Sequence, residues 1–406
     1  MTGFNTTAIH AGQEPDEQTG AVTVPIHLAT TYAQQGVNQH KGFEYSRTGN
    51  PTRAALETSI AALEGATHGF AFGSGMAAED AIMRMLQPGD NVLLGNDAYG
   101  GTFRLLDKIY GKIGVTWTAV DLTKPELVAS MWADNTKMVW LETPTNPNLT
   151  CFDIEAIAAA AHEQGGLCVA DNTFATPYLQ QPINLGADLV VHSATKYLGG
   201  HGTTLAGVVV EGGRFPWDNG KFPGMTEPSD GYHGVRFFET FGDFGFTMKA
   251  RCETLRTLGH AMSPFNAFMM LQGLETLPIR MDRHCSNAVG VAEYLRAHPA
   301  VSWVNYAGLE DNPYQPLVKK YLPNGAGSIM TFGVKGGSAA GEKFINNAQF
   351  MSHLANIGDA KSLACHPAST THRQLGEDEL AASGVTPDLV RLSIGIENVK
   401  DIIADI

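Results

Sequence analysis

One lysine stands among small hydroxyl residues in a segment, 192–202, that reads HSATKYLGGHG. Lys196 follows the apolar run 189–191 and precedes a Gly-rich stretch, so we predict a buried strand that ends in a loop. A lysine amine at a strand end suits Schiff-base chemistry, because its pKa shifts readily when it is partly buried. The hydroxyls of Ser193 and Thr195 can donate hydrogen bonds to a phosphate. A surface lysine on a solvated loop explains this segment equally well.

Two other segments carry residue types that bind phosphate. Residues 68–78 have the pattern of a short strand, a Gly turn and a helix start, and the free N–H groups of a helix N-terminus bind phosphate. The full GxGxxG spacing is missing, so the Gly turn alone is a weak signal. Tyr45 and Arg47 lie two residues apart in an extended stretch, so their side chains point the same way and can clamp a phosphate. A solvated loop is the alternative for this stretch.

These residues must be positioned by a larger framework, and the chain supplies alternating strands and helices. We expect one helix that ends at Gly65 and another that spans 154–162. Strands are expected at 68–72, 91–95, 115–120, 138–141, 167–170 and 189–191. The alternation predicts a mostly parallel sheet covered on both faces, with ligands at the carboxyl ends of its strands. Polar candidates lie at or just beyond such ends: Ser74, Tyr99, Asn146, Asp171, Ser193 and Lys196. Their convergence predicts a binding site at this edge.

The remaining segments suggest an arm, an excursion and a second domain. Residues 1–50 have few helical patterns and are expected to form an extended arm. Residues 211–250 are rich in Gly, Phe and Pro without periodicity, which indicates a long ordered excursion that lines the site or a subunit contact. A long helix is expected from Ser263 through Arg283. It leads into a smaller sheet with strands at 301–306, 328–334 and 390–394.

Composition excludes several function classes. The chain has 406 residues, of which 43% are hydrophobic, so it can bury a large core and divide into two domains. A net charge of −14 without any basic block argues against nucleic acid as a partner. No apolar run reaches the length of a membrane span, and the N-terminus lacks the pattern of a signal peptide. The five cysteines are scattered without a CxxC pair, which fits a cytoplasmic protein and gives no metal framework.

Ordered motifs along nearly the whole chain resemble one known family. They are YSRTGNPT (45–52), GSGMAA (73–78), YGGT (99–102), ETPTNP (142–147), ADNTF (170–174), SATKYLGGHG (193–202) and RLSIGIE (391–397). The chain resembles the pyridoxal-phosphate (PLP) enzymes of cysteine and methionine metabolism, which include cystathionine γ-synthase and the O-acetylhomoserine sulfhydrylases. The resemblance implies an α/β fold, the PLP-dependent transferase fold type I, which is aspartate-aminotransferase-like. That fold has a mostly parallel central sheet and a smaller α+β C-terminal domain.

The resemblance also implies a role for the residues around the cofactor ring. Lys196 would hold PLP covalently and then move protons. Asp171 would pair with the ring nitrogen and keep it protonated, because a charged ring nitrogen makes the ring an electron sink. Tyr99 would stack on the ring and assist proton transfer near the γ-carbon of the substrate. No metal is implied.

Other residues would hold the rest of the cofactor and the substrate. The phosphate would be bound by Gly75, Met76, Ser193 and Thr195. Tyr45 and Arg47 would reach the phosphate from a neighbouring subunit, so the active unit would be a dimer, and the homo-oligomer a tetramer of such dimers. Asn146 would lie near the 3-hydroxyl of the cofactor. Arg391 would bind the substrate α-carboxylate, with Asn356 beside it.

The domain organisation implied for this chain has three parts. Residues 1–50 form an N-terminal arm that contributes to the neighbouring subunit's site. Residues 51–262 form the large PLP-binding domain, and residues 263–406 form the C-terminal domain that binds the substrate carboxylate.

The choice of reaction depends on the second half of the chain. The first half resembles cystathionine synthases and lyases, whereas the second half resembles O-acetylhomoserine sulfhydrylase. Relatives that handle cystathionine carry a Glu immediately before the segment that corresponds to 356–358, and this chain has Ala355 there. Such a Glu suits the distal amino group of cysteine, so its absence favours sulfide as the nucleophile. The expected reaction is γ-replacement on O-acetyl-L-homoserine by sulfide, which gives L-homocysteine and acetate in methionine biosynthesis.

Other functions remain open at this point. Within the family, cystathionine γ-synthase acting on L-cysteine and an acylhomoserine is the alternative, and γ-lyase side activity follows it. A non-catalytic PLP carrier would not need Arg391 and Tyr99, which are both present. A nicotinamide dehydrogenase would need the full GxGxxG after its first strand, and the chain lacks it.

Overall fold

Apolar runs in the first half of the chain form a seven-stranded sheet in the computed structural model, which describes residues 3–370 and 384–406. The spatial order is β1-β7-β6-β5-β4-β2-β3, and the pairs among β2 to β6 are parallel. Only β7 runs antiparallel to its neighbours β1 and β6. The strands are β1 (His68–Phe72), β2 (Asn91–Gly95), β3 (Thr116–Val120), β4 (Thr136–Glu142), β5 (Leu167–Asp171), β6 (Leu189–His192) and β7 (Gly207–Glu211). The mostly parallel central sheet is therefore confirmed.

Strand residues alternate between two hydrophobic cores, one on each face of this sheet. In β2, Leu93 belongs to the first core, whereas Val92 and Leu94 belong to the second. The first core is covered by α2 (Pro51–Leu63) and α6 (Ile154–Glu163), and the second by α3 (Gly75–Met83) and α10 (Gly245–Ala250). Burial on both faces explains why the strands read as continuous apolar runs rather than alternating ones.

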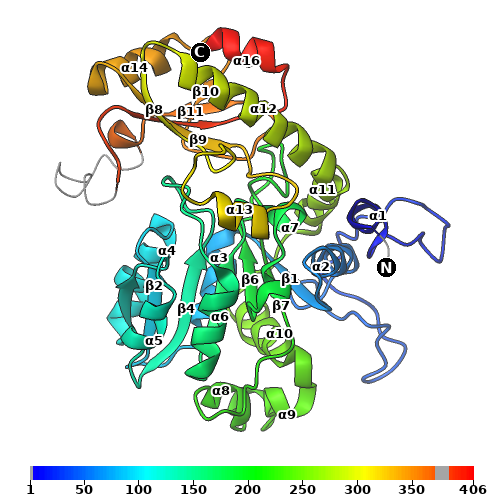
Figure 1. Ribbon diagram of the computed structural model, residues 1–406. Coiled ribbons are helices and arrows are strands. Elements are labelled where there is room, and N and C mark those ends of the chain that lie inside the picture. The colour runs from blue at the N-terminus through cyan, green and yellow to red at the C-terminus, as the bar shows by residue number, and fades with distance from the viewer. Residues whose placement is uncertain (1–2, 371–383) are drawn as a thin grey trace.

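A smaller, mostly antiparallel sheet lies above the first in Figure 1. Its order is β10-β11-β12-β9-β8, with only β10 and β11 parallel. The strands are β8 (Val301–Asn305), β9 (Ile329–Val334), β10 (Ser352–His353), β11 (Leu363–Cys365) and β12 (Leu389–Ser393). The three strands expected from the sequence are β8, β9 and β12, and the implied smaller second sheet is confirmed. Whether the domains meet at residues 262 and 263 stays a prediction.

The remaining helices are mostly short. They are α1 (Phe4–His10), α4 (Gly100–Arg104), α5 (Glu126–Met131), α7 (Thr176–Leu179), α8 (Pro223–Thr226), α9 (Phe237–Phe241), α11 (Pro264–Glu275), α12 (Leu277–Ala297), α13 (Gln315–Tyr321), α14 (Gly337–Asn347) and α16 (Val399–Asp405). None of the helices within 3–370 and 384–406 is long and apolar enough to cross a membrane.

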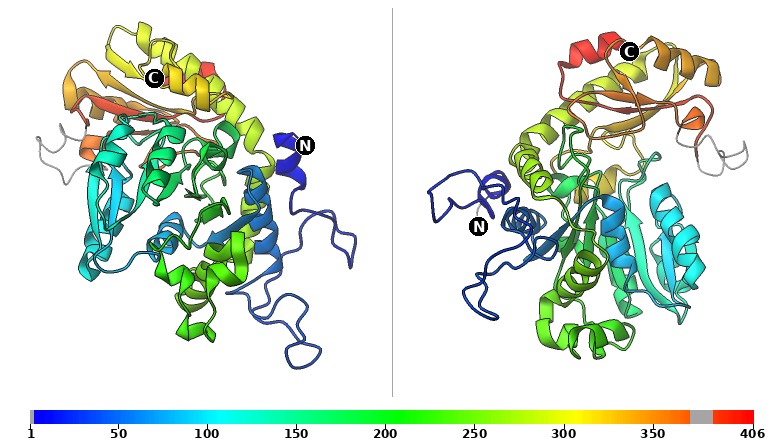
Figure 2. Two further views of the ribbon diagram at one scale, coloured as in Figure 1. Left: turned by 60° about the horizontal axis from the view of Figure 1, so that its bottom comes forward. Right: turned by 180° about the vertical axis from the view of Figure 1, so that it is seen from behind.

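Three expectations need correction. The arm is not wholly extended, because α1 forms at its start and buries Ala8 against α2. The helix expected from Ser263 through Arg283 is two helices that separate at Thr276, and the second continues to Ala297. The excursion 211–250 contains the short helices α8, α9 and α10, which are too brief to give a periodic pattern. Beyond α1 the arm projects from the body of the molecule as loops (Figure 2).

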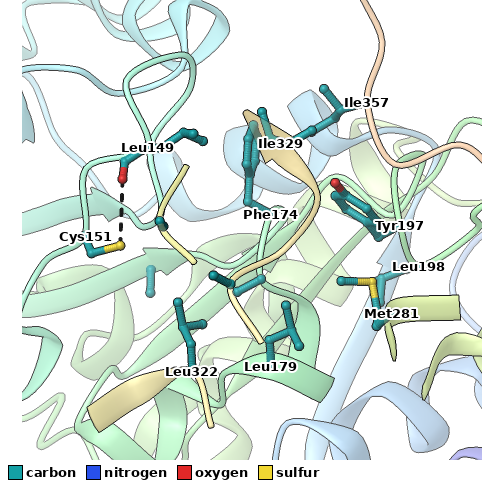
Figure 3. Close-up of a cluster of buried hydrophobic side chains, with 14 of the residues drawn as sticks. Leu149, Cys151, Phe174, Leu179, Tyr197, Leu198, Met281, Leu322, Ile329 and Ile357 are labelled. Atoms are coloured by element: carbon teal, nitrogen blue, oxygen red, sulfur yellow. Dashed lines mark hydrogen bonds between the residues drawn. The ribbon is translucent and has the colours of Figure 1, made fainter. Parts of the chain in front are cut away.

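Hydrophobic side chains join the two sheets directly beneath the predicted lysine loop. Figure 3 shows Phe174 beside Ile329 of β9, with Tyr197 and Leu198 of the lysine loop facing Met281 of α12. All of these side chains belong to the same buried core, which continues from the large sheet into the small one. The lysine loop is thus packed between the sheets rather than exposed on a surface.

A buried arginine fixes the backbone of this loop. Arg280 of α12 is 4% exposed, and burial lowers the pKa of its guanidinium to about 10. Its Nη1 donates to the Tyr197 carbonyl at 2.7 Å, and its Nη2 donates to the carbonyls of Leu198 at 3.3 Å and Gly273 at 2.6 Å. These bonds satisfy buried carbonyl groups of the lysine loop and of the last turn of α11.

Replacing this arginine tests how far the loop depends on it. We expect Arg280→Met to lower the free energy of unfolding by about 3 kcal/mol, because it leaves buried carbonyls without donors. Arg296→Met is the matched control on the same helix: its ion pair with Asp311 is exposed, so the change should stay within about 0.5 kcal/mol. Urea unfolding followed by circular dichroism measures both. Equal effects of the two substitutions would contradict this role for Arg280.

Candidate active site

The polar residues expected at the strand ends do meet in one cavity. It has a volume of about 250 Å³ and lies at the carboxyl edge of the large sheet, beneath the small one. It is lined by Ser74, Gly75, Met76, Glu79, Tyr99, Glu142, Asn146, Asp171, Thr173, Phe174, Ser193, Thr195, Lys196, Leu205, Ala355, Ile357 and Arg391. The convergence predicted from the sequence is therefore confirmed for all the residues named for it.

Lys196 enters this cavity from the loop after β6. Its Nζ donates a hydrogen bond to Oδ1 of Asn356, which lies between β10 and β11. Burial and then the nearby positive charge of Arg391 lower the pKa of the lysine amine below its usual value. A larger fraction of the amine is consequently uncharged near neutral pH, which is the form that attacks a carbonyl carbon or accepts a proton.

Arg391 reaches the same cavity from the small sheet. It lies on β12, is buried, and donates from Nη1 to Oδ1 of Asn146 at 2.9 Å. Its Nη2 donates to the main-chain carbonyl of Asn356 at 3.2 Å. Asn356 therefore contacts both Lys196 and Arg391. A carboxylate bound by this arginine would lie next to the lysine amine.

An anion-binding surface lies at the start of α3. The hydroxyl of Ser74 caps the helix by accepting from the N–H of Ala77 at 3.1 Å, and Gly75 and Met76 come at its first turn. Their N–H groups have no carbonyl partner within the helix, so they are available to an anion. A Cβ on Gly75 would lie 2.8 Å from the Cβ of Ser193, so only glycine lets this turn approach the lysine loop. Free N–H groups, hydroxyls and a close backbone approach fit a phosphate.

Carboxyl groups form another part of the cavity wall. Oδ1 of Asp171 accepts from the Thr173 hydroxyl at 2.5 Å and from the Thr173 N–H at 3.0 Å, so its orientation is fixed. Burial raises the pKa of the Asp171 carboxyl. Burial and the charge of Asp171 also raise the pKa of Glu142, which accepts from the N–H of Tyr99 at 2.8 Å. That bond positions the half-exposed Tyr99 at the cavity wall.

This donor set fits PLP. It offers one lysine with a lowered pKa, one oriented carboxylate for a ring nitrogen, a tyrosine at the wall and an anion site on a helix N-terminus. The cavity of about 250 Å³ has room for a molecule of one ring.

Three predicted site residues do not line this cavity: Asn356, which contacts Lys196 and Arg391, and two residues of the arm. Tyr45 and Arg47 belong to the arm, where the Arg47 guanidinium carbon lies 4.9 Å from the Tyr45 ring centre, so they do face the same way. Tyr45 lines a separate pocket of about 330 Å³ that includes Arg251. Neither residue lines the cavity of its own chain, and their contribution to a neighbouring subunit stays a prediction.

Sequence reasoning assigned no role to two acidic residues that the structure places at the cavity. Glu79 and Glu142 both line it, although each lies within or next to a quoted motif. Glu142 is the last residue of β4, and ligands of parallel sheets bind at the carboxyl ends of the strands. The same rule that predicted the other polar residues could therefore have identified Glu142. Glu79 is one helical turn after Gly75, a spacing that puts both on one side of α3.

Comparison with known proteins agrees with this geometry. The family model for Cys/Met metabolism PLP-dependent enzymes matches residues 5–406. O-acetyl-L-homoserine sulfhydrylase from Leptospira meyeri is 45% identical, covering 99% of this chain and 95% of the relative. O-acetyl-L-homoserine sulfhydrylase 1 from Thermus thermophilus is 43% identical, covering 99% and 98%. The structure of metY from Campylobacter jejuni, determined with N'-pyridoxyl-lysine-5'-monophosphate, is 36% identical and covers 100% and 98% with a TM-score of 0.95.

Two glycines of one turn test the anion site. We expect Gly75→Ala to cut cofactor affinity at least tenfold, because the new methyl group must displace Ser193. Gly73→Ala is the matched control: its Cβ would meet nothing closer than 3.8 Å and its backbone is not left-handed. Fluorescence titration of the cofactor-free protein with PLP measures both affinities. An unchanged affinity in Gly75→Ala would rule out this site for the phosphate.

Proposed function

Because the chain belongs to the Cys/Met-metabolism family of PLP-dependent enzymes, we propose that it replaces the acetyl-bearing oxygen of O-acetyl-L-homoserine with sulfide. The products are L-homocysteine and acetate: the bond from Cγ to oxygen breaks and a bond from Cγ to sulfur forms. The observation that carries this proposal is full-length similarity to relatives named for this activity, at 42–45% identity. The apolar wall at Ala355 supports sulfide as the nucleophile.

In this proposal the cavity residues hold PLP by its ends. The N–H groups of Gly75 and Met76, with the hydroxyls of Ser193 and Thr195, bind the phosphate. Asp171 binds the ring nitrogen, Tyr99 covers the ring, Asn146 lies by the 3-hydroxyl, and Lys196 is the point of covalent attachment. When bound, PLP supplies an electron sink that stabilises negative charge on the substrate carbons next to the amino group.

The substrate is oriented by the small sheet. Arg391 binds the α-carboxylate with paired donors, and its bond to Asn146 keeps the guanidinium in place. The α-carbon is then held near Lys196, which accepts the α-proton with its amine because its pKa is lowered by burial and by Arg391. Asn356 holds the amine by accepting a bond from Nζ. Tyr99, which lines the cavity, would transfer a proton near the γ-carbon.

The proposal extends to assembly and location. Tyr45 and Arg47 lie on the projecting arm and outside their own chain's cavity, which supports their entry into a neighbouring subunit's site. We therefore propose an active dimer, two of which form a tetramer, in the cytoplasm. Light scattering of the purified chain measures the assembly, and a monomer with full activity contradicts it.

Product analysis tests the reaction. Purified holoenzyme receives O-acetyl-L-homoserine with sulfide or with L-cysteine in parallel, and the products are quantified by chromatography. We expect homocysteine to form from sulfide faster than cystathionine forms from cysteine. Faster cystathionine formation would identify the chain as a cystathionine γ-synthase, and 2-oxobutyrate without either product would identify a γ-lyase.

Ala355 provides a test of nucleophile choice. Its side chain is exposed at the cavity wall, so a longer one can extend without displacing the core. We expect Ala355→Glu to shift the preference from sulfide toward cysteine by about tenfold, because a carboxylate there attracts the amino group of cysteine. Ala355→Gln is the control of equal size without charge. If both variants shift the ratio of the two kcat/KM values equally, the charge at this position does not set the nucleophile.

A further inference from the structure

Glu79 carries a buried carboxyl group that lines the cavity, and the proposed function gives it no role. It lies on α3, and its side chain is 4% exposed. Its Oε2 atom makes no hydrogen bond within the described part of the chain. Buried polar atoms are almost always paired in folded proteins, so an unpaired carboxyl oxygen at a ligand cavity points to a group that the ligand supplies.

A second unpaired atom lies beside it. Thr102 on α4 is fully buried, and its hydroxyl oxygen also has no bonded partner within 3–370 and 384–406. The Thr102 hydroxyl lies near the Glu79 carboxyl without meeting the geometry of a hydrogen bond, and its proximity lowers the pKa of Glu79. The site therefore already contains a dipole that stabilises negative charge at Glu79 once that charge forms.

Burial and the neighbouring charges favour the protonated form of Glu79. Burial, followed by the charge of Asp171 on β5, raises the pKa of Glu79 to about 8. Glu142 on β4 adds a third carboxyl to the same wall. The cations of the cavity, Lys196 after β6 and Arg391 on β12, are bonded to Asn356 and Asn146 rather than to these carboxyls. Within 3–370 and 384–406, no Lys or Arg side chain forms an ion pair with these three carboxyls, and the basic group that acts on Asp171 is His192, which is paired with Glu64.

We propose that Glu79 is a second carboxyl group for the ring nitrogen of PLP and acts beside Asp171. A protonated ring nitrogen would supply a cation beside these carboxyls, and two carboxylates stabilise it more than one. The O–H bond of Glu79 breaks when that cation enters, and the proton leaves to solvent or to a ring nitrogen that arrived without one. Glu79 is a positioning residue in this scheme, since its charge holds the nitrogen in the protonated form.

This inference rests on the PLP dependence of the family and not on the proposed acyl group or nucleophile. Its test uses no substrate, so its failure is distinct from failure of the product analysis. The full chain, freed of cofactor, is titrated at one mildly alkaline pH with PLP and with the PLP analogue that has carbon in place of the ring nitrogen. Both probes carry the same aldehyde and phosphate, so the ratio of their dissociation constants isolates the contribution of the ring nitrogen.

We expect Glu79→Gln to lower the affinity for PLP roughly tenfold or more. The substitution removes the negative charge of Glu79 beside the cationic ring nitrogen, and at a moderate effective dielectric constant that attraction is worth about this factor. Affinity for the analogue should stay within about twofold, because it presents no cation for the carboxylate to stabilise. Glu79→Asp keeps a carboxyl and should retain most of the wild-type ratio, which also covers the case in which the Gln variant does not fold. Absorption spectra of the PLP-loaded variants give a second, independent readout of the ring nitrogen's protonation.

Glu211→Gln is the matched control. Glu211 ends β7, burial raises its pKa to about 7, and it accepts from the N–H groups of Phe246 and Thr247 without lining the cavity. It is a buried carboxyl of similar kind, and its substitution should leave the ratio unchanged. Equal weakening of both probes in Glu79→Gln, or no weakening of either, overturns the proposal.

Discussion

The contact between the lysine loop and the small sheet determines the relative positions of the residues that line the cavity. Gly358, in the left-handed region with φ +70°, packs so tightly that a Cβ would lie 2.6 Å from the N–H nitrogen of Tyr197. Its own N–H donates to the hydroxyl of Ser393 on β12 at 3.0 Å. The N–H of Ala360 donates to the carbonyl of Gly200 at 2.9 Å. Backbone therefore meets backbone here, which leaves little freedom in the separation of Lys196 from Arg391.

That fixed separation also divides the charges of the site. The cations, Lys196 and Arg391, share Asn356 at the boundary with the small sheet. The carboxyls Glu142 and Asp171 end neighbouring strands of the large sheet, where they are paired in register. The basic groups and the carboxyl groups of the cavity are therefore separated from each other before any ligand arrives. A ligand with a cationic ring nitrogen and anionic phosphate and carboxylate groups complements this arrangement only in one orientation.

The sequence was informative where local pattern determines structure. Strands such as β2 and β5 are short apolar runs that end in polar residues, and parallel topology brings those ends together without further information. β7 was missed because it lies among glycines and hydroxyl residues after the lysine loop. β10 was missed because a strand of two residues is too short to show an alternating pattern. The break at Thr276 depends on tertiary packing, which a continuous helical pattern does not reveal. Arg391 and Asn356 are far from Lys196 in sequence, so only the family resemblance connected them to it. Glu79 resembles an ordinary acidic residue of an exposed helix face until its burial is known.

The two hydrophobic cores differ in extent, and this difference determines which parts of the molecule depend on each other for their packing. One core contains side chains of both sheets, such as Val190 of β6 and Leu392 of β12. The other contains side chains of the large sheet, of helices on its second face such as α3, and of the excursion 211–250, but none of the small sheet. Residues that share a core lose their packing together, so the lysine loop and the small sheet form a single cooperative unit. The helix α10 lies on the opposite face and contributes side chains only to the second core. A local displacement of α10 therefore need not change the separation between Lys196 and Arg391, because neither residue packs in a core that α10 shares with the small sheet.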